Sequence, residues 1–256
     1  MGNILRIENL TVRFHALKAV SDFSMDVESG TIRGMIGPNG AGKTTVFNAI
    51  SGFVKPVAGT ISFLQKEVTR LEPHRITSLG IARTFQNIKL FRDLSVLENV
   101  MIGFHLRFNP FLFWQAVLRL PGYKNREREI YNNAIALLEK TSLLHLSNEK
   151  ALSLPYGLQR RLEIARAIAT RPKLLLLDEP AAGMNPSEKD GLMDFIKGIR
   201  NEFDLTVLLI EHDMHVVMGI CDKITVLDYG ERIAEGCPED IRSNPRVIEA
   251  YLGETT

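Results

Sequence analysis

The sequence has few cysteines and almost no excess charge. Cys221 and Cys237 are its two cysteines in 256 residues, which excludes a disulfide framework and suits a reducing compartment. The net charge is +1, so the chain lacks the strong basic field typical of nucleic-acid binders. Apolar residues at 45% and charged residues at 24% are ordinary for a globular chain with a sizeable core.

Long apolar runs are also missing, and no stretch approaches the roughly 20 apolar residues that span a bilayer. The nearest candidate, residues 108–122, is interrupted by Gln115 and Arg119. Arg6 and Glu8 stand where a signal peptide needs an apolar core, and Arg6 also stands where a myristoylation site needs Ser or Thr. We therefore expect a cytosolic chain without a transmembrane segment of its own.

The apolar periodicity predicts an α/β fold. Residues 4–14 alternate with a change of phase after Asn9, and residues 23–27 repeat the period of two, which indicates an opening antiparallel β subdomain. Short apolar runs, typical of a parallel sheet covered on both faces, occupy residues 32–36, 174–177, 207–210 and 224–227. The helical patterns between them cover residues 44–51, 159–170 and 189–201.

Residues 90–159 differ from the rest because they show no buried strand. Ser95 and Glu98 form a predicted capping box, and further helical patterns run through Trp114 and over residues 126–144. We expect an inserted helical subdomain here, leading into the helix that follows. The predicted single domain of residues 1–256 thus has an α/β core made of residues 1–89 and 160–256.

The segment GPNGAGKTT at residues 37–45 follows an apolar run and opens a helix. It matches G-x-x-x-x-G-K-[ST], in which glycines bend the backbone so that successive N–H groups face phosphate oxygens. Lys43 adds a charge for the terminal phosphates and Thr44 a hydroxyl for Mg²⁺. The alternative is a glycine-rich turn with an incidental lysine. The predicted phosphate site comprises Gly37, Pro38, Asn39, Gly40, Ala41, Gly42, Lys43, Thr44 and Thr45.

Acidic residues follow two of the buried runs. Asp178 can hold Mg²⁺, mostly through a water bound to the ion. Glu179 could accept a proton from an attacking water, and a general base in this position typically raises the reaction rate by about 10²–10⁴. An ordinary acid pair at the end of a strand is the alternative. His212 follows the run at 207–210 and is predicted to contact the γ-phosphate or the attacking water; a zinc site with Asp213 and His215 is disfavoured by their spacing.

Together with the glutamine of RTFQN, these motifs occur in the order and spacing of ABC-type ATPase subunits, which the whole chain resembles. The resemblance implies a P-loop NTPase (RecA-like) core that binds ATP and Mg²⁺. It implies that Gln86 senses the γ-phosphate and couples to a membrane partner. It also places Phe14 against adenine, although a strand aromatic in the core is the alternative. The implied metal ligands are Thr44, Gln86 and Asp178, and the implied catalytic residues are Glu179, His212 and Gln86.

SLPYGLQRR at residues 153–161 resembles the L-S-G-G-Q helix start that serves a nucleotide on another ATPase subunit in this family. One phosphate loop leaves the outer face of the γ-phosphate open, and a second helix N-terminus can close it. Pro155 replaces the usual Ser and Leu158 the usual Gln, so we expect a weaker site, unless the Gly157 N–H and the helix end suffice. The implied signature residues are Leu154, Pro155, Tyr156, Gly157, Leu158 and Gln159.

Several segments are similar to one subgroup, the branched-chain amino acid importer ATPases of the LivG type. They are Tyr156, RRLEIAR, AAGMNP, DMHVVMGICD and NPRVIEAYLGE. The subgroup implies an ATP-hydrolysing subunit at the cytoplasmic face of the membrane. Its implied partners are permease subunits, a second ATPase subunit that is a paralogue or an identical copy, and an extracytoplasmic solute-binding protein, with no nucleic acid. The alternatives are a urea, amide or lipopolysaccharide system, a soluble ABC ATPase, and a module that switches without turnover.

The segment 107–121 concentrates Phe108, Phe111, Phe113 and Trp114. We favour a helix packed on its own domain over a surface that contacts a permease. A helix lying on the membrane is disfavoured, because lysine and arginine do not line one face.

Overall fold

The structure is a computed structural model that describes residues 2–105 and 121–252. It divides into two compact units. Unit 1 comprises Met1–Gln86 and Lys173–Thr256, and unit 2 is Asn87–Pro172. The sequence-based boundary at residue 159 assigned the following helix to the core. This helix, α6 (Tyr156–Ala169), belongs to unit 2, where it packs against α3 (Val96–His105) and α5 (Pro121–Lys140). The aromatic residues of 107–120 lie outside the described residues.

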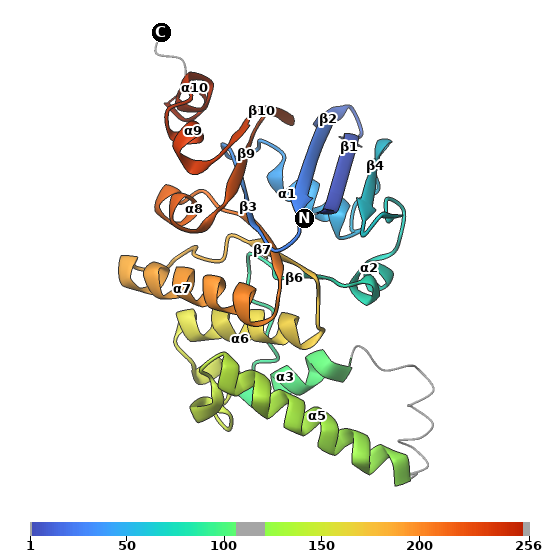
Figure 1. Ribbon diagram of the computed structural model, residues 1–256, viewed down its shortest axis with the longest axis vertical. Helices are drawn as coiled ribbons and strands as arrows, with labels where there is room; N and C mark the ends of the chain where they lie inside the picture. Colours follow the sequence, from blue (N-terminus) through green and yellow to red (C-terminus); the bar gives the residue numbers. More distant parts are fainter. Residues whose placement is uncertain (1, 106–120, 253–256) are drawn as a thin grey trace. The chain divides into compact units, whose positions relative to one another are not determined.

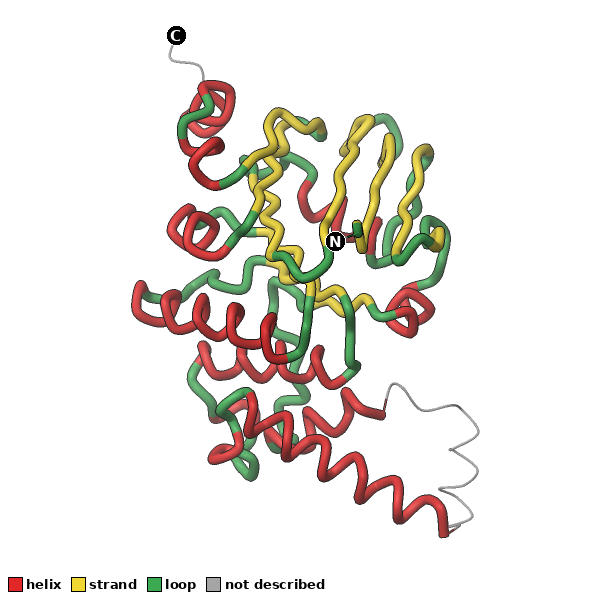
Figure 2. The backbone as a smooth tube through the Cα atoms, viewed as in Figure 1, coloured by secondary structure: helices red, strands yellow, loops and turns green. Residues whose placement is uncertain are grey.

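A six-stranded sheet in the order β10-β9-β3-β8-β7-β6 forms the centre of unit 1 (Figure 2). Its strands are β3 (Ile32–Ile36), β6 (Ile81–Arg83), β7 (Leu174–Asp178), β8 (Thr206–Ile210), β9 (Lys223–Asp228) and β10 (Glu231–Gly236). Only β10 pairs antiparallel among them. The buried runs predicted from the sequence are confirmed as β3, β7, β8 and β9. The pattern missed β6, which has three residues, and β10, which is polar.

The predicted N-terminal antiparallel subdomain is confirmed as a second sheet in the order β2-β1-β4-β5. These strands are β1 (Asn3–Phe14), β2 (Leu17–Glu28), β4 (Ala58–Phe63) and β5 (Lys66–Glu67). The change of phase after Asn9 is an irregularity inside one strand. Asn9 has φ 51° and donates its backbone N–H to Ser24 Oγ over 2.9 Å, and the register with β2 shifts between Ile7 and Leu10.

Helix α1 (Lys43–Ile50) contributes to one hydrophobic cluster with both sheets. Val46 and Phe47 share this cluster with Leu10 of β1 and Leu208 of β8, all fully buried. Helices α7 (Pro186–Glu202) and α8 (Met214–Ile220) lie on the other side of the six-stranded sheet (Figure 1). Unit 1 is completed by α2 (Pro73–Leu79), α9 (Pro238–Arg242) and α10 (Pro245–Leu252).

Unit 2 is helical in its described part, as predicted. It contains α3 (Val96–His105), α5 (Pro121–Lys140) and α6 (Tyr156–Ala169). The predicted capping box is confirmed, because Ser95 N–H donates to Glu98 Oε2 over 2.7 Å and Glu98 N–H donates to Ser95 Oγ over 3.2 Å. The hydrogen bonds from the backbone and the hydroxyl of Ser95 lower the pKa of Glu98.

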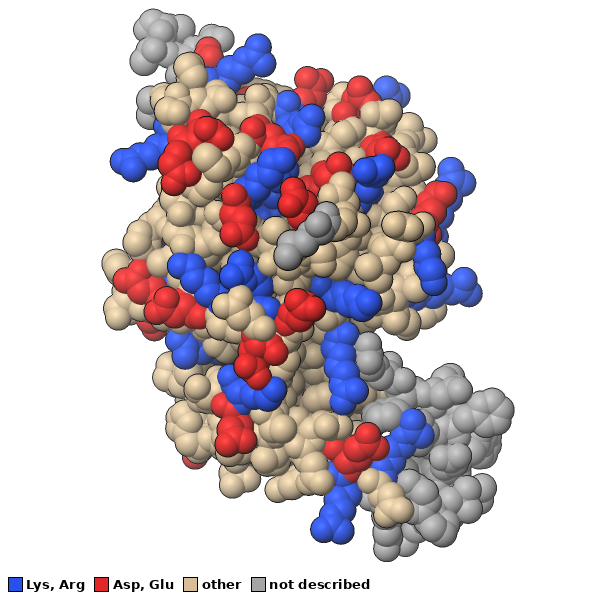
Figure 3. Space-filling view, in the orientation of Figure 1, with Lys and Arg blue, Asp and Glu red and all other residues tan. Residues whose placement is uncertain are grey.

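Acidic and basic side chains intermingle on the face of unit 1 seen in Figure 3, in keeping with the small net charge. Within residues 2–105 and 121–252, no helix combines the length and the apolar character that crossing a bilayer requires.

Candidate nucleotide-binding site

The glycine-rich loop connects β3 to α1, as the motif predicts. Gly37 has φ 149°, and a Cβ on it would lie 2.0 Å from the carbonyl oxygen of Leu227 in β9. No side chain fits there, so glycine is required at this position. The loop then turns back, with Ala41 N–H donating to Pro38 O over 3.2 Å. The first N–H groups of α1 have no partner within the helix, which is the condition for binding an anion.

Lys43 begins α1 and is 6% exposed. Its Nζ donates to Gly37 O over 2.7 Å and to Pro38 O over 2.8 Å. Burial lowers the pKa of Lys43, against the attraction of the Glu179 and Asp178 carboxylates, which raises it. The structure therefore brings the loop lysine and the strand-end acids of β7 into one electrostatic site. The alternative of an incidental lysine does not account for this arrangement.

Asp178 is held by a residue that the sequence analysis did not select. Arg83, at the end of β6, donates from Nη2 to Asp178 Oδ2 over 2.8 Å, and the two side chains are 7% and 6% exposed. Its Nη1 donates to Asn48 Oδ1 and to Ser51 Oγ of the α1 segment, both over 2.8 Å. One guanidinium thus ties the carboxylate to α1. The sequence feature that could have identified Arg83 is its charge inside the short strand β6, three positions before Gln86.

Aromatic rings surround the Arg83 guanidinium. Its central carbon lies 5.3 Å from the ring centroid of Phe85, 5.7 Å from that of Phe47 and 5.9 Å from that of Phe53. Each ring face attracts the cation and excludes water from it. The Arg83–Asp178 pair is consequently a desolvated interaction, in which each charge depends on the other.

Glu179 follows β7 with φ 45°, an uncommon backbone conformation for a residue with a side chain. Gln86 Nε2 donates to Glu179 Oε2 over 3.0 Å. His212 Nδ1 lies 3.8 Å from the same oxygen, and the His212 side chain is 57% exposed. The structure therefore brings together the three residues selected as catalytic candidates, around one carboxylate oxygen.

Glu211 supports this arrangement and was also missed as a site residue. It is fully buried, and its carboxylate accepts the backbone N–H of Ala181 over 2.8 Å and that of His212 over 3.2 Å. Burial raises the pKa of Glu211, while these backbone hydrogen bonds lower it. Glu211 thus links the segment after Glu179 to the segment that carries His212.

Hard oxygen ligands, which Mg²⁺ prefers, are present at the site. Thr44 is exposed at the start of α1, and the Asp178 carboxylate lies at the end of β7. These groups fit a magnesium ion bound with a triphosphate. The zinc alternative lacks such support, because Asp213 pairs with Lys189 over 2.5 Å and His215 with Asp190 over 2.8 Å, which are separate contacts.

Phe14 ends β1 and is 44% exposed. The alternative that it is a core strand residue is therefore wrong. Its ring is available for contact with a flat ligand.

In unit 2, the segment that resembles a signature helix begins α6. Pro155 is the N-cap and provides no side-chain cap, Leu154 is 6% exposed, and Gln159 Nε2 donates to Leu154 O over 2.8 Å. Tyr156 is 41% exposed, whereas Gly157 and Leu158 are partly buried.

The positive charge in the first turns of α6 is partly internal. Arg160 is fully buried and pairs with Glu163 over 2.7 Å. The other oxygen of Glu163 accepts the backbone N–H of Lys89 over 2.9 Å. Arg160 therefore has a structural role within unit 2.

The comparison with known families agrees with this site. A family model described as "ABC transporter" matches residues 20–182, which is more than half of the chain. The chain belongs to the ABC transporter family. A second model, described as "Branched-chain amino acid ATP-binding cassette transporter", matches residues 231–255.

Curated ABC relatives extend the match to nearly the full length. The chain is 47% identical over 251 residues to the high-affinity branched-chain amino acid transport ATP-binding protein BraF of Pseudomonas aeruginosa, covering 98% of both chains. It is 45% identical over 251 residues to LivG of Escherichia coli K12, with the same coverage. The chain is thus a member of the LivG/BraF group of ATP-binding proteins.

The fold also matches solved ABC cassettes. The ADP conformation of an ATP-binding cassette of an ABC transporter aligns with a TM-score of 0.87 and 34% identity, covering 99% of this chain and 100% of that one. A nucleotide-free cassette aligns with a TM-score of 0.85 at the same identity. The predicted P-loop NTPase fold is therefore confirmed.

We predict that Arg83→Met strongly destabilises this ABC cassette. The substitution leaves the buried Asp178 carboxylate without its cation, and breaking such a pair costs about 3–5 kcal/mol. The free energy of unfolding, measured by urea denaturation, tests this, with exposed Arg75→Met as the control. Adding Asp178→Asn to Arg83→Met should recover much of the lost stability. If Arg83→Met were as stable as the control Arg75→Met, the prediction would be contradicted.

We also predict a pH dependence from Glu211. Because the folded state raises its pKa above the ordinary value of 4.5, the folded protein binds more protons than the unfolded chain above that pH. Relative to Glu211→Gln, the wild type should lose free energy of unfolding as the pH rises from 4.5 toward the raised pKa, and should show no such trend below 4.5. Denaturation curves across pH measure this difference, and Glu231→Gln on β10 is the control. A difference that is constant with pH would refute it.

Proposed function

We propose that this chain is the ATP-hydrolysing subunit of an importer of branched-chain amino acids. The observation that supports this most is the convergence of Lys43, Asp178 and Glu179 at the edge of the sheet where the glycine-rich loop begins. A loop that presents N–H groups and a lysine beside two acids suits the binding and cleavage of a triphosphate.

In this proposal, ATP binds with its phosphates in the loop 37–45. Lys43 exchanges its two carbonyl contacts for the terminal phosphates, and the N–H groups at the start of α1 face the phosphate oxygens. The exposed ring of Phe14 stacks on adenine.

Hydrolysis in this proposal depends on Glu179. Its carboxylate accepts a proton from the attacking water, while Gln86 and His212 hold that water and the γ-phosphate in position. Thr44 and Asp178, with help from Gln86, would hold a magnesium ion, which would neutralise charge at the phosphates. Arg83 keeps the Asp178 carboxylate in place.

In this proposal, the exposed end of the bound triphosphate requires a second ATPase subunit. A second ATPase subunit, paralogous or identical, seals it with the N-terminus of its own α6, and this chain's α6 does the same for the partner's nucleotide. Permease subunits hold the pair at the cytoplasmic face of the membrane, and an extracytoplasmic solute-binding protein delivers the solute. The names of the BraF and LivG relatives support branched-chain amino acids as that solute.

We predict that Glu179→Gln abolishes ATP turnover and retains ATP binding, because the amide keeps the shape of the side chain but cannot accept a proton. The rate should fall by about 10²–10⁴. Phosphate release by the complex reconstituted with its permease measures this, and exposed Glu67→Gln on β5 is the control. Turnover by Glu179→Gln at the control rate would refute the proposed mechanism.

In the same complex, a leucine-loaded solute receptor should stimulate wild-type turnover. Stimulation by urea or a short amide instead would assign the chain to a related importer. ATP turnover that is unchanged by the permease and by the solute receptor would favour a soluble ABC ATPase.

We further predict that Pro155→Ser strengthens the site that α6 completes. Serine supplies both an N-cap, worth about 1 kcal/mol to the helix, and a donor for the partner's γ-phosphate. ATPase activity of the assembled complex and the free energy of unfolding should both rise relative to Pro155→Ala, which removes the proline ring without adding a hydroxyl. Activity equal to that of Pro155→Ala would show that the Gly157 N–H and the helix end suffice.

A further inference from the structure

The turn between β9 and β10 is bonded to the glycine-rich loop on one side and to the N-terminal sheet on the other. Gly230 N–H donates to Ala41 O over 3.0 Å, and Ser21 N–H donates to Gly230 O over 2.9 Å. A Cβ on Gly230, which has φ 82°, would lie 2.8 Å from Ala19 O. The turn therefore fits between the loop and β2 only as glycine.

Helix α10 approaches the loop from a later point in the chain. Tyr251, on its last turn, places its hydroxyl near the backbone of Gly37. A cavity of about 840 Å³ has residues 38–41 on its wall together with Arg246, Glu249 and Ala250 of α10. The tip of the loop and α10 thus line opposite walls of this cavity.

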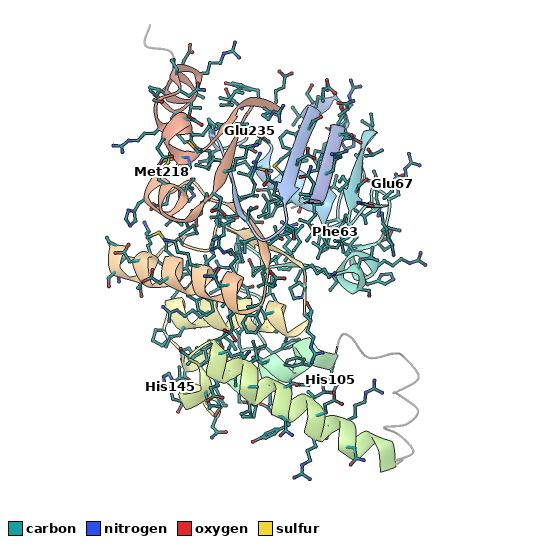
Figure 4. All side chains as sticks on the ribbon, in the orientation of Figure 1. Phe63, Glu67, His105, His145, Met218 and Glu235 are labelled. Carbon is teal, nitrogen blue, oxygen red and sulfur yellow. The ribbon has the colours of Figure 1, made fainter. Side chains whose placement is uncertain are left out.

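The strand between these two contacts is anchored to the sheet. Glu235 of β10, labelled in Figure 4, pairs with buried Arg33 of β3 over 3.0 Å and with Lys223 of β9. Against the effect of burial, these cations lower the pKa of Glu235 to about 2. Strand β10, which joins the turn to the helices α9 and α10, is consequently fixed to the same sheet from which the glycine-rich loop emerges.

We propose that the segment 229–251 is a positioning element for the glycine-rich loop and that it determines the affinity of the chain for nucleotide. Holding the loop in its phosphate-binding shape before the ligand arrives lowers the cost of ordering it on binding. The segment overlaps residues 231–255, which match a family model separate from the one that covers the loop. The inference rests on the proposed role of the loop as the phosphate site.

The test measures the dissociation constant of Mg-ADP for the full chain by calorimetry. Tyr251→Phe removes one hydroxyl and Gly230→Ala adds one methyl group against Ala19. Their matched controls are Tyr131→Phe, an exposed tyrosine of α5, and Gly30→Ala, where φ is 77° and no atom lies within 4 Å of the added Cβ. Lys43→Ala reports on the phosphate site itself.

We expect Tyr251→Phe to weaken Mg-ADP binding by about 3- to 10-fold and Gly230→Ala by about tenfold or more, relative to the controls. In the assembled complex, KM for ATP should rise with kcat unchanged, which a loss of folded protein would not produce. Should Gly230→Ala fail to fold, Tyr251→Phe decides alone.

Dissociation constants equal to those of the controls would overturn the proposal, even if the melting temperatures fell, provided that Lys43→Ala abolishes binding. If Lys43→Ala binds Mg-ADP normally, the loop is not the phosphate site, and the positioning role fails with it.

Discussion

The close approach of Gly37 to the end of β9 is the constraint on which the nucleotide site depends. β3 and β9 are neighbouring parallel strands, and Ile36 pairs with Val226 immediately before the loop begins. The loop must therefore leave the sheet directly beside the Leu227 carbonyl, with room for a hydrogen atom and nothing larger. The same geometry brings the β9–β10 turn within hydrogen-bonding distance of Ala41. The loop, which lies in the first segment of unit 1, is therefore bordered by residues of the second segment.

The two cations of the site differ in how firmly they are held. The contacts of Lys43 can be exchanged, whereas those of Arg83 are fixed. Lys43 is held by carbonyl oxygens of its own loop, which a phosphate can replace at little cost because both are oxygen acceptors. Arg83 is enclosed by aromatic rings and bound to Asp178, Asn48 and Ser51, so its position is fixed by several contacts at once. A site of this kind can exchange ligands at the lysine and keep the carboxylate geometry constant.

The sequence predicted the features that depend on local pattern. The glycine-rich loop, the buried strands and the Ser95–Glu98 capping box each involve residues close together in the chain, and all are present. The contacts that it did not predict join distant residues. Arg83 and Asp178 are 95 positions apart, and Ala181 and Glu211 are 30 apart, so neither pairing has a local signature. The polar strand β10 was missed for a related reason, since its Glu235 is paired with Arg33 and Lys223, which belong to other strands.

Glu163 has a mechanical consequence for unit 2. Its two carboxylate oxygens bind different segments, one the side chain of Arg160 in α6 and the other the backbone of Lys89, a few residues after Gln86. All of this occurs in a site where Arg160 and Glu163 are almost completely shielded from water. Displacing the chain at Lys89 without moving α6 would strip a buried carboxylate of a partner, which is costly. The position of the chain at Lys89 and the position of the first turns of α6 are therefore coupled through this one carboxylate.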